Sequence, residues 1–524
     1  MSYTSLVFAA FVAITILVYY LFPVKKYQWT VLLVAGIVFY LWFSVRYGVF
    51  ILFTIFTIWL SGLLMSNIED ETKRIVKENK ETWSKEERKA FKKKAENKKL
   101  VILVIALVLN FGILGLIKYF DAFAGSLFGR FFGEPGEDGV IRLLMPLGIS
   151  FYTFQSTGYL IDLYRGNVEA EKNPFKLGLF ISYFPQIVQG PIGQFEKLHH
   201  QLIAEHRPEW IRFKQGGELI LWGLLKKLII ADRAVVAISA FQEDVASHTG
   251  TVTLFVALLY ALQLYADFSG GIDISRGVSQ MLGVDLAINF RRPYFAKSIN
   301  EYWRRWHISL GEWMKNYVFY SLAVSDPFLK LGRKVNKNLP TAIASFIVFV
   351  LVGIWHGSNS KYLAFGIWNG LLVALSVMLA PTFEKMAEKL KINVKSKIWQ
   401  LFQMGRTFIL VLVGYYFDIA PSFSGAMLML KKTVTNLTLA GLKSGVKELG
   451  LGLFDYKVIM VAGLVLLYFS IRLEVKNLET PGELLEERKG WVQWIVIFIA
   501  ILLLITWGWY GPGYDPAEFV YMQF

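Results

Sequence analysis

Long apolar segments recur along almost the whole of this sequence, with short charged segments between them. A transmembrane helix needs about 20 predominantly apolar residues to cross the hydrocarbon core of a bilayer. Soluble domains contain about 25% charged residues, whereas only 18% of these 524 residues are charged and 55% are hydrophobic. We therefore expect an all-α polytopic integral membrane protein with about eleven transmembrane helices and one or two re-entrant segments. The apolar runs are residues 5–22, 29–42, 50–65, 100–117, 143–163, 175–188, 219–230, 251–265, 341–355, 362–379, 408–417, 458–469 and 492–507.

The net charge of +15 and the absence of cysteine narrow the functional classes. Lys and Arg concentrate in the cytoplasmic loops of membrane proteins, and this explanation is favoured over nucleic-acid binding. Without cysteine, the chain has no disulfides, no thiolate catalysis and no cysteine metal site. No Lys or Arg precedes the run at 5–22 and no small-residue cleavage site follows it. We expect this run to be a retained first span and not a signal peptide.

A charged segment over residues 69–99 sets the expected orientation. It contains twelve Lys or Arg and eight Asp or Glu residues, with both signs at helical spacing. This predicts a solvated helix or helical hairpin inserted into one membrane domain that spans residues 1–524. Its basic excess places it in the cytoplasm, so the N-terminus, three spans earlier, lies on the outer side of the membrane. Lys25 and Lys26 then lie on the inner side, and the acidic loop at 133–139 lies on the outer side.

The apolar runs between residues 145 and 193 are interrupted by Gly, Pro, Ser and Gln. Non-helical backbone at membrane depth is tolerated only where it is buried in protein or lines a wet cavity. We expect part of this stretch to be re-entrant or kinked. The sequence has no phosphate loop, dinucleotide fingerprint, nucleophile elbow or zinc-binding helix motif, so we expect neither a bound metal nor a permanently bound cofactor.

His356 is the leading candidate for catalysis. An apolar run ends at Trp355 and His356, and Gly357 leaves room for a close approach of ligand or backbone. Ionisable residues in such positions are usually functional, and histidine has the side-chain pKa nearest neutral pH, which suits a general base. The alternative is a structural histidine whose hydrogen bonds are made with a neighbouring helix. Four of the other histidines lie in polar connecting segments.

Two further clusters carry ionisable groups. His307 lies among Trp303, Trp306 and Trp313, which would form one face of a helix, either an interfacial amphipathic helix or part of a site. In the second cluster, Asp267 closes an apolar span. Asp273 and Arg276 are three residues apart and would be neighbours on a helix, where structural pairing and catalysis are both open.

At this point the residues resemble the membrane-bound O-acyltransferases, in the bacterial branch of alginate O-acetyltransferases and D-alanyl-lipoteichoic-acid transferases. Six segments match in the order that this family has them. The matching segments are residues 146–155, 158–165, 184–192, 265–274, 303–310 and 353–357, and residues 519–524 also resemble the family's C-terminal end.

The resemblance implies roles for these residues. His356 matches the family's catalytic histidine and His307 its partner, inside a ring of helices that is thin at its centre. A cytoplasmic thioester donor, acetyl-coenzyme A or an acylated carrier protein, would reach His356 from one side and an acceptor hydroxyl from the other. Arg305 could also meet an anionic donor group or a lipid phosphate. The expected supporting or tunnel residues are Trp306, Arg305, Asp267, Trp355, Ser309 and Asp273.

The sequence favours acetylation of an extracellular polysaccharide, because D-alanyl transferases of this family are typically shorter and the extra length lies largely after Leu379. D-alanyl transfer to teichoic acid remains the alternative, and a transporter is a second one. The expected partners are membrane lipid, the thioester donor, an extracytoplasmic transferase or acceptor-binding protein and a cytoplasmic carrier protein, with no nucleic acid.

Overall fold

The computed structural model describes residues 2–119, 134–135, 141–142, 146–438 and 440–510. These residues form two compact units, which we describe separately. The first contains residues 5–212 and 279–286, and the second contains residues 2–4, 213–278 and 287–510, within the described ranges.

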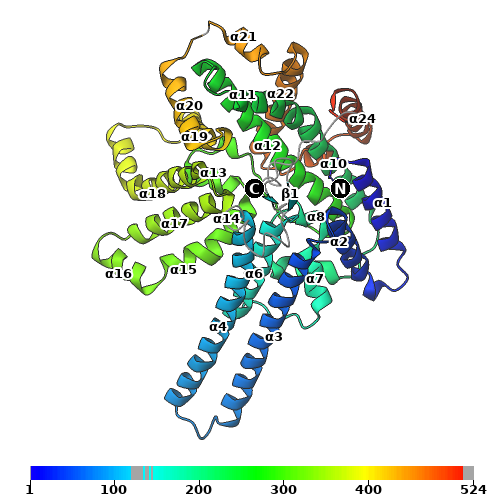
Figure 1. Ribbon diagram of the computed structural model, residues 1–524, viewed down its shortest axis with the longest axis vertical. Coiled ribbons are helices and arrows are strands. Elements are labelled where there is room, and N and C mark those ends of the chain that lie inside the picture. The colour runs from blue at the N-terminus through cyan, green and yellow to red at the C-terminus, as the bar shows by residue number, and fades with distance from the viewer. Residues whose placement is uncertain (1, 120–133, 136–140, 143–145, 439, 511–524) are drawn as a thin grey trace. The chain divides into compact units, whose positions relative to one another are not determined.

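The first unit consists mainly of helices (Figure 1). The one strand pair among its described residues is very short, with Glu134 opposite Arg142 and Pro135 opposite Ile141. The rest of the acidic loop expected at 133–139 lies outside the described residues. The elements are α1 (Leu6–Leu21), η1 (Lys25–Tyr27), α2 (Trp29–Phe43), α3 (Gly48–Glu78), α4 (Lys85–Lys118), β1 (Glu134–Pro135), β2 (Ile141–Arg142), α6 (Ile149–Arg165), α7 (Pro174–Ser182), α8 (Phe184–Ile187) and α9 (Phe195–Ile203).

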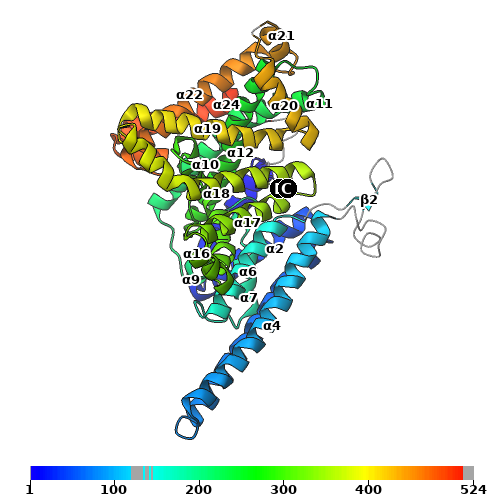
Figure 2. The same ribbon diagram turned by 90° about the vertical axis from the view of Figure 1, so that its left-hand side faces the viewer.

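Helices α3 and α4 pack side by side and carry the charged segment at 69–99 on their adjoining ends. Ser84 is the N-cap of α4 and forms a capping box with Glu87. The Ser84 hydroxyl accepts the Glu87 amide, and the Glu87 carboxylate accepts the Ser84 amide. Both hydrogen bonds satisfy amides that the start of a helix leaves free. Lys99 pairs with Glu69 across the two helices at 2.6 Å. Figure 2 shows α4 continuing past α6 and α7, so the charged ends project from the rest of this unit as a helical hairpin.

The interruption expected between residues 145 and 193 is present as the short helices α7 and α8 and their irregular connections. Gly148 has φ +65° before α6, and a Cβ there would lie 1.9 Å from the Ile187 carbonyl oxygen, so only glycine fits. Gln155 donates to the Phe180 carbonyl, and Gln186 donates to Gln155 at 2.9 Å. These amides supply hydrogen bonds that the backbone of the broken helices lacks.

The regular elements among the described residues of the second unit are all helical, and two of them, η3 and η5, are π-helical turns (Figure 1). Its elements are α10 (Trp210–Leu225), η3 (Lys226–Ala231), α11 (Asp232–Glu243), α12 (Gly250–Met281), η4 (Pro293–Phe295), α13 (Ile299–Arg305), α14 (Ile308–Trp313), η5 (Met314–Phe319), α15 (Tyr320–Ala323), α16 (Asp326–Lys334), α17 (Leu339–His356), α18 (Ser360–Lys389), α19 (Lys397–Ile419), α20 (Phe423–Thr435), α21 (Leu442–Lys447), α22 (Leu453–Lys476), α23 (Pro481–Glu486) and α24 (Gly490–Trp507).

Eight helices among the described residues are long and apolar enough to cross a membrane. The predicted all-α polytopic membrane architecture is confirmed, while the number of eleven spans stays a prediction. The run at 5–22 forms a helix of 16 residues, which is about 24 Å long and shorter than the bilayer core. The eight helices are Lys25–Phe43, Gly48–Glu78, Lys85–Lys118, Gly250–Met281, Leu339–His356, Ser360–Lys389, Leu453–Lys476 and Gly490–Trp507.

Candidate active site

A cavity of about 720 Å³ lies within the second unit, and both candidate histidines line it. One face of α17 forms much of its wall, because the lining residues of this helix recur at spacings of three and four. His356 is the last residue of α17, so it lies at one end of this face. From Thr341 to His356 the face extends about 22 Å at the helical rise of 1.5 Å per residue. The lining residues of α17 are Thr341, Ser345, Val348, Phe349, Val352 and His356.

The packing of α17 on α18 fixes His356. A Cβ on Gly353 would lie 2.5 Å from the Tyr362 carbonyl oxygen, and one on Gly366 would lie 2.5 Å from the Phe349 carbonyl oxygen. The two glycines therefore allow the helices to approach closely, as small residues do in membrane bundles. The imidazole of His356 is buried and stacks on the Phe365 ring at a centroid distance of 5.4 Å.

His307 lies between α13 and α14 in the left-handed backbone region, with φ 45°. This conformation costs about 1–2 kcal/mol for a residue with a Cβ, and such strain often marks functional sites. The continuous helix expected across Trp303–Trp313 is therefore wrong. The chain breaks because the backbone oxygen of Asn289 accepts the amide of Ile308 at 3.0 Å, and its side-chain Oδ1 accepts the amide of Ser309 at 2.9 Å.

Asn289 also determines which nitrogen of His307 carries the proton. Its Oδ1 lies 3.3 Å from Nδ1 of His307. Because the same oxygen accepts the Ser309 amide, it cannot be the amide nitrogen, so Nδ1 of His307 must be the donor. In the neutral imidazole, Nε2 is then the basic nitrogen. Asn289 was not predicted from the sequence, because nothing there distinguishes it from other asparagines. It stands out only in the structure, where its side chain is completely buried.

Aromatic rings hold the two histidines from several sides. Trp306 lines the cavity and stacks on Tyr302 at 5.8 Å. The ring of Phe268 meets His307 edge to face at 4.8 Å. Trp355 packs edge to face against His356 at 5.0 Å and does not line the cavity. Ser309 is buried and is engaged by Asn289, so it lies beside the site and not in the cavity wall.

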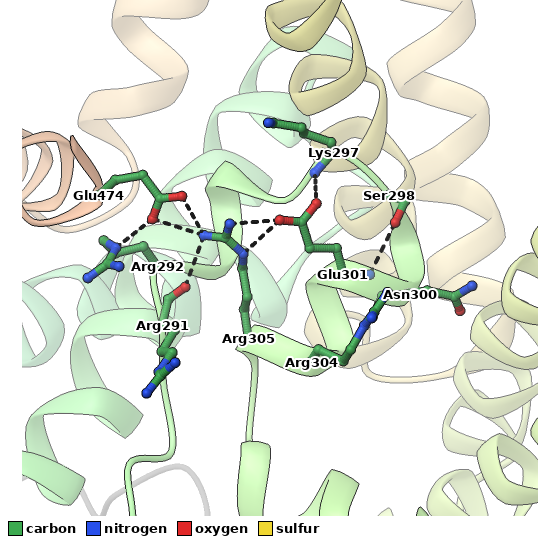
Figure 3. A network of polar contacts seen from close by, with 9 residues as sticks. All are labelled: Arg291, Arg292, Lys297, Ser298, Asn300, Glu301, Arg304, Arg305 and Glu474. Atoms are coloured by element: carbon green, nitrogen blue, oxygen red, sulfur yellow. Dashed lines mark hydrogen bonds and ion pairs between the residues drawn. The ribbon is translucent and has the colours of Figure 1, made fainter. Parts of the chain in front are cut away.

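Arg305 is part of an ionic network near the cavity (Figure 3). Its guanidinium bonds Glu301 at 2.7 Å and Glu474 at 2.9 Å. Glu474 also pairs with Arg292 at 2.7 Å. These ion pairs connect α13 to α22 and neutralise the charge of Arg305. Unlike Arg305, the adjacent Arg304 lines the cavity. No described carboxylate lies within ion-pairing distance of Arg304.

Asp267 and Asp273 lie within α12, which continues past the apolar run as far as Met281. Lys227 bonds Asp267 at 2.7 Å and Asp232 at 2.9 Å, and all three side chains are buried. Lys226 bonds Asp273 at 2.6 Å. Both lysines are consecutive residues at the start of η3. Asp267 and Asp273 thus belong to buried and part-buried ion pairs, and removing one partner from a buried pair costs about 3–5 kcal/mol.

None of the cavity residues forms a recognisable metal site. Among the described residues no group of three or more His, Cys, Asp or Glu is placed to hold a metal ion. The imidazoles and charged groups that line the cavity are those of His307 and His356, the cations Arg304 and Lys315, and the carboxylates Glu312 and Asp418.

The comparisons with known proteins bear directly on this site. The model of the MBOAT, membrane-bound O-acyltransferase family matches residues 172–415, which include both histidines. A probable alginate O-acetylase from Pseudomonas syringae pv. tomato is 31% identical over 420 residues, which are 79% of this chain and 71% of the relative. The chain belongs to the membrane-bound O-acyltransferase family.

Two other relatives extend the comparison. A probable alginate O-acetylase from Pseudomonas putida is 28% identical over the full length of both chains. A teichoic acid D-alanyltransferase from Streptococcus thermophilus is 30% identical over 45% of this chain and 58% of the relative. With its apolar helices, this member of the membrane-bound O-acyltransferase family is a multi-pass membrane protein and an O-acyltransferase. The resemblance and the reaction class expected from the sequence are confirmed, and the transporter alternative is not supported.

Proposed function

We propose that this protein transfers acetyl groups from a cytoplasmic thioester donor towards hydroxyls of an extracellular polysaccharide. The observation that carries the proposal is the placement of His307 and His356 in the wall of one cavity. The relatives named alginate O-acetylases support the acetyl group and the polysaccharide, since they match over 79% and 100% of the chain. The donor is acetyl-coenzyme A or an acylated carrier protein, and it binds as a substrate and not as a resident cofactor.

The residues suggest a direct transfer step. An acceptor hydroxyl oxygen attacks the thioester carbonyl carbon, so that a C–O bond forms and the C–S bond breaks. His356 takes the hydroxyl proton and passes it to the leaving thiolate, which balances the reaction without a further reactant. Positioned proton transfer of this kind contributes about 100- to 10,000-fold to a rate.

The hydrogen bonds of His307 favour a positioning role. Its Nδ1 donates to Asn289, so Nε2 offers a lone pair and no proton to its surroundings in the neutral ring. A lone pair can accept a hydrogen bond from an imidazole N–H or a hydroxyl, whereas it would repel a thioester carbonyl oxygen. We therefore assign His307 to orienting His356 or the acceptor hydroxyl, and not to polarising the carbonyl.

Arg304 is the cation that we assign to the anionic part of the donor. Arg304 is one of two cations in the cavity wall, with Lys315, and no ion pair with a described carboxylate neutralises it. Coenzyme A and the prosthetic arm of a carrier protein both carry phosphate, and guanidinium groups bind phosphate well. Arg305, the residue expected to do this from the sequence, is already bonded to Glu301 and Glu474.

The Arg304→Ala variant is expected to raise the KM for acetyl-coenzyme A about tenfold, since one charge-assisted hydrogen bond is lost. Steady-state hydrolysis of radiolabelled acetyl-coenzyme A by purified protein measures this. The matched control is Arg333→Ala, which removes an exposed arginine on α16 outside the cavity. Equal KM values in the two variants would exclude Arg304 from donor binding.

We further propose that the protein lies in a bacterial plasma membrane as one membrane domain, with the N-terminus outside and the α3–α4 hairpin in the cytoplasm. The basic excess of the hairpin supports this orientation. A carrier protein would then meet the inner face, and an extracytoplasmic transferase or acceptor-binding protein would meet the outer face.

Single-cysteine labelling tests the orientation without background, because the chain has no cysteine. An impermeant maleimide is expected to label Ser2→Cys in intact cells and Lys92→Cys only after the membrane is permeabilised. The reverse pattern would refute the proposed topology.

D-alanyl transfer is the second candidate, because the Streptococcus thermophilus relative carries that name. To distinguish the two functions, the purified protein is incubated with each donor in turn, acetyl-coenzyme A and a D-alanylated carrier protein. We expect turnover of the acetyl donor; turnover of the D-alanyl donor alone would favour teichoic acid as the acceptor.

A further inference from the structure

Asp418 is a carboxylate in the cavity wall that has no role in the site described so far. It lies near the end of α19, where Val411, Tyr415 and Asp418 recur at spacings of four and three and line the cavity together. Its Oδ1 is buried and has no hydrogen-bond partner among the described residues.

The nearest cation does not satisfy this oxygen. Lys361 donates its hydrogen bonds to backbone carbonyls instead, to Asp418 at 3.1 Å and to Ala420 at 2.7 Å. It thereby caps the C-terminal end of α19. A buried carboxylate oxygen without a donor is unfavourable, and buried groups left in this state call for an explanation in function or in an absent ligand. Because the cavity borders Asp418, a ligand can supply the missing donor.

Position and charge indicate which substrate this ligand is. Lys361, at the start of α18, marks the Asp418 end of the cavity, and the ring of His356 lies 6.1 Å from that of the adjacent Tyr362. Asn300 bonds Ser376 on the same helix at 2.9 Å, and Arg304 bonds the Asn300 carbonyl. The fifteen residues from Lys361 to Ser376 correspond to about 22 Å along α18. Asp418 and Arg304 thus lie towards opposite ends of the cavity, with His356 at the Asp418 end.

We propose that Asp418 forms the hydroxyl-binding subsite for the acceptor, next to His356. The inference rests on the proposed acyl transfer. A carboxylate only accepts hydrogen bonds, so it binds hydroxyl groups and disfavours the donor's thioester oxygen and phosphates. One hydroxyl of a sugar donates to Asp418 while its neighbour attacks the thioester carbonyl carbon and gives its proton to His356. The C–O bond forms, the C–S bond breaks and the thiol leaves with that proton.

The experiment measures how the acyl group divides between water and an acceptor. Full-length protein in lipid nanodiscs receives radiolabelled acetyl-coenzyme A with methyl α-mannoside as the acceptor probe. Released acetate reports hydrolysis, and acetylated mannoside reports transfer. Asp418→Asn is expected to lower the ratio of transfer to hydrolysis about tenfold, while hydrolysis changes by less than about twofold. Asp418→Glu, which keeps a carboxylate, is expected to recover most of the ratio.

A matched control is Glu384→Gln, which makes the same chemical change on an exposed position of α18 outside the cavity. An unchanged ratio in Asp418→Asn would overturn the inference, and so would an equal loss of transfer and hydrolysis in a variant that purifies as a monodisperse protein. Hydrolysis by the wild type without transfer to mannoside would also overturn it. A wild type that neither hydrolyses nor transfers would refute the proposed function itself.

Discussion

The His356→Ala variant is expected to turn over acetyl-coenzyme A about 100- to 10,000-fold more slowly than the wild type. The imidazole lies at the end of the cavity face of α17, where it is buried against Phe365. Alanine removes the group that we propose accepts the hydroxyl proton, and no other described imidazole lines the cavity except His307. Release and transfer of radiolabelled acetyl groups by purified protein measure this loss.

The same substitution should leave the fold intact, because the close contact of α17 with α18 depends on Gly353 and Gly366 and not on the imidazole. Size-exclusion profiles and thermal melting of the two proteins check this. His200→Ala is the matched control, since His200 is exposed on α9. Turnover by His356→Ala at the wild-type rate would remove His356 from the mechanism.

The helical membrane architecture followed from the sequence because it depends on local composition. Runs of apolar residues must satisfy their backbone internally in a bilayer, and a helix does this regardless of its neighbours. The capping box at Ser84 and the charge pattern of the hairpin are equally local. The helix break at His307 was missed because its cause, Asn289, lies eighteen residues earlier and acts through tertiary hydrogen bonds.

The candidate site could be predicted from the sequence only in part. His356 and His307 stood out as imidazoles in apolar or aromatic surroundings, and the structure brings both to one cavity. The choice between Arg304 and Arg305 could not be made from the sequence, because it depends on Glu474 in a distant helix. Asp267 was suspected for its position in an apolar run, yet its partner is Lys227, a buried cation from η3.

Asn289 offers the sharpest test of the positioning role of His307. Replacement by leucine removes the oxygen that accepts both Nδ1 of His307 and the Ser309 amide. The imidazole then loses its fixed tautomer and the left-handed turn at His307 loses its clamp. A lost hydrogen bond that leaves a buried donor unsatisfied costs about 1–3 kcal/mol, so kcat should fall about 5- to 150-fold. Steady-state kinetics with acetyl-coenzyme A provide the measurement.

Asn289→Asp distinguishes positioning from a general loss of structure. Aspartate keeps an oxygen that accepts from both N–H groups, so the aspartate variant should recover much of the kcat that the leucine variant loses. The KM for the donor should change little in either, because Asn289 does not line the cavity. If both variants lose activity and thermal stability in parallel, Asn289 supports the fold alone. Recovery by aspartate with an unchanged KM would show that the hydrogen bond to Nδ1 holds His307 in its working tautomer.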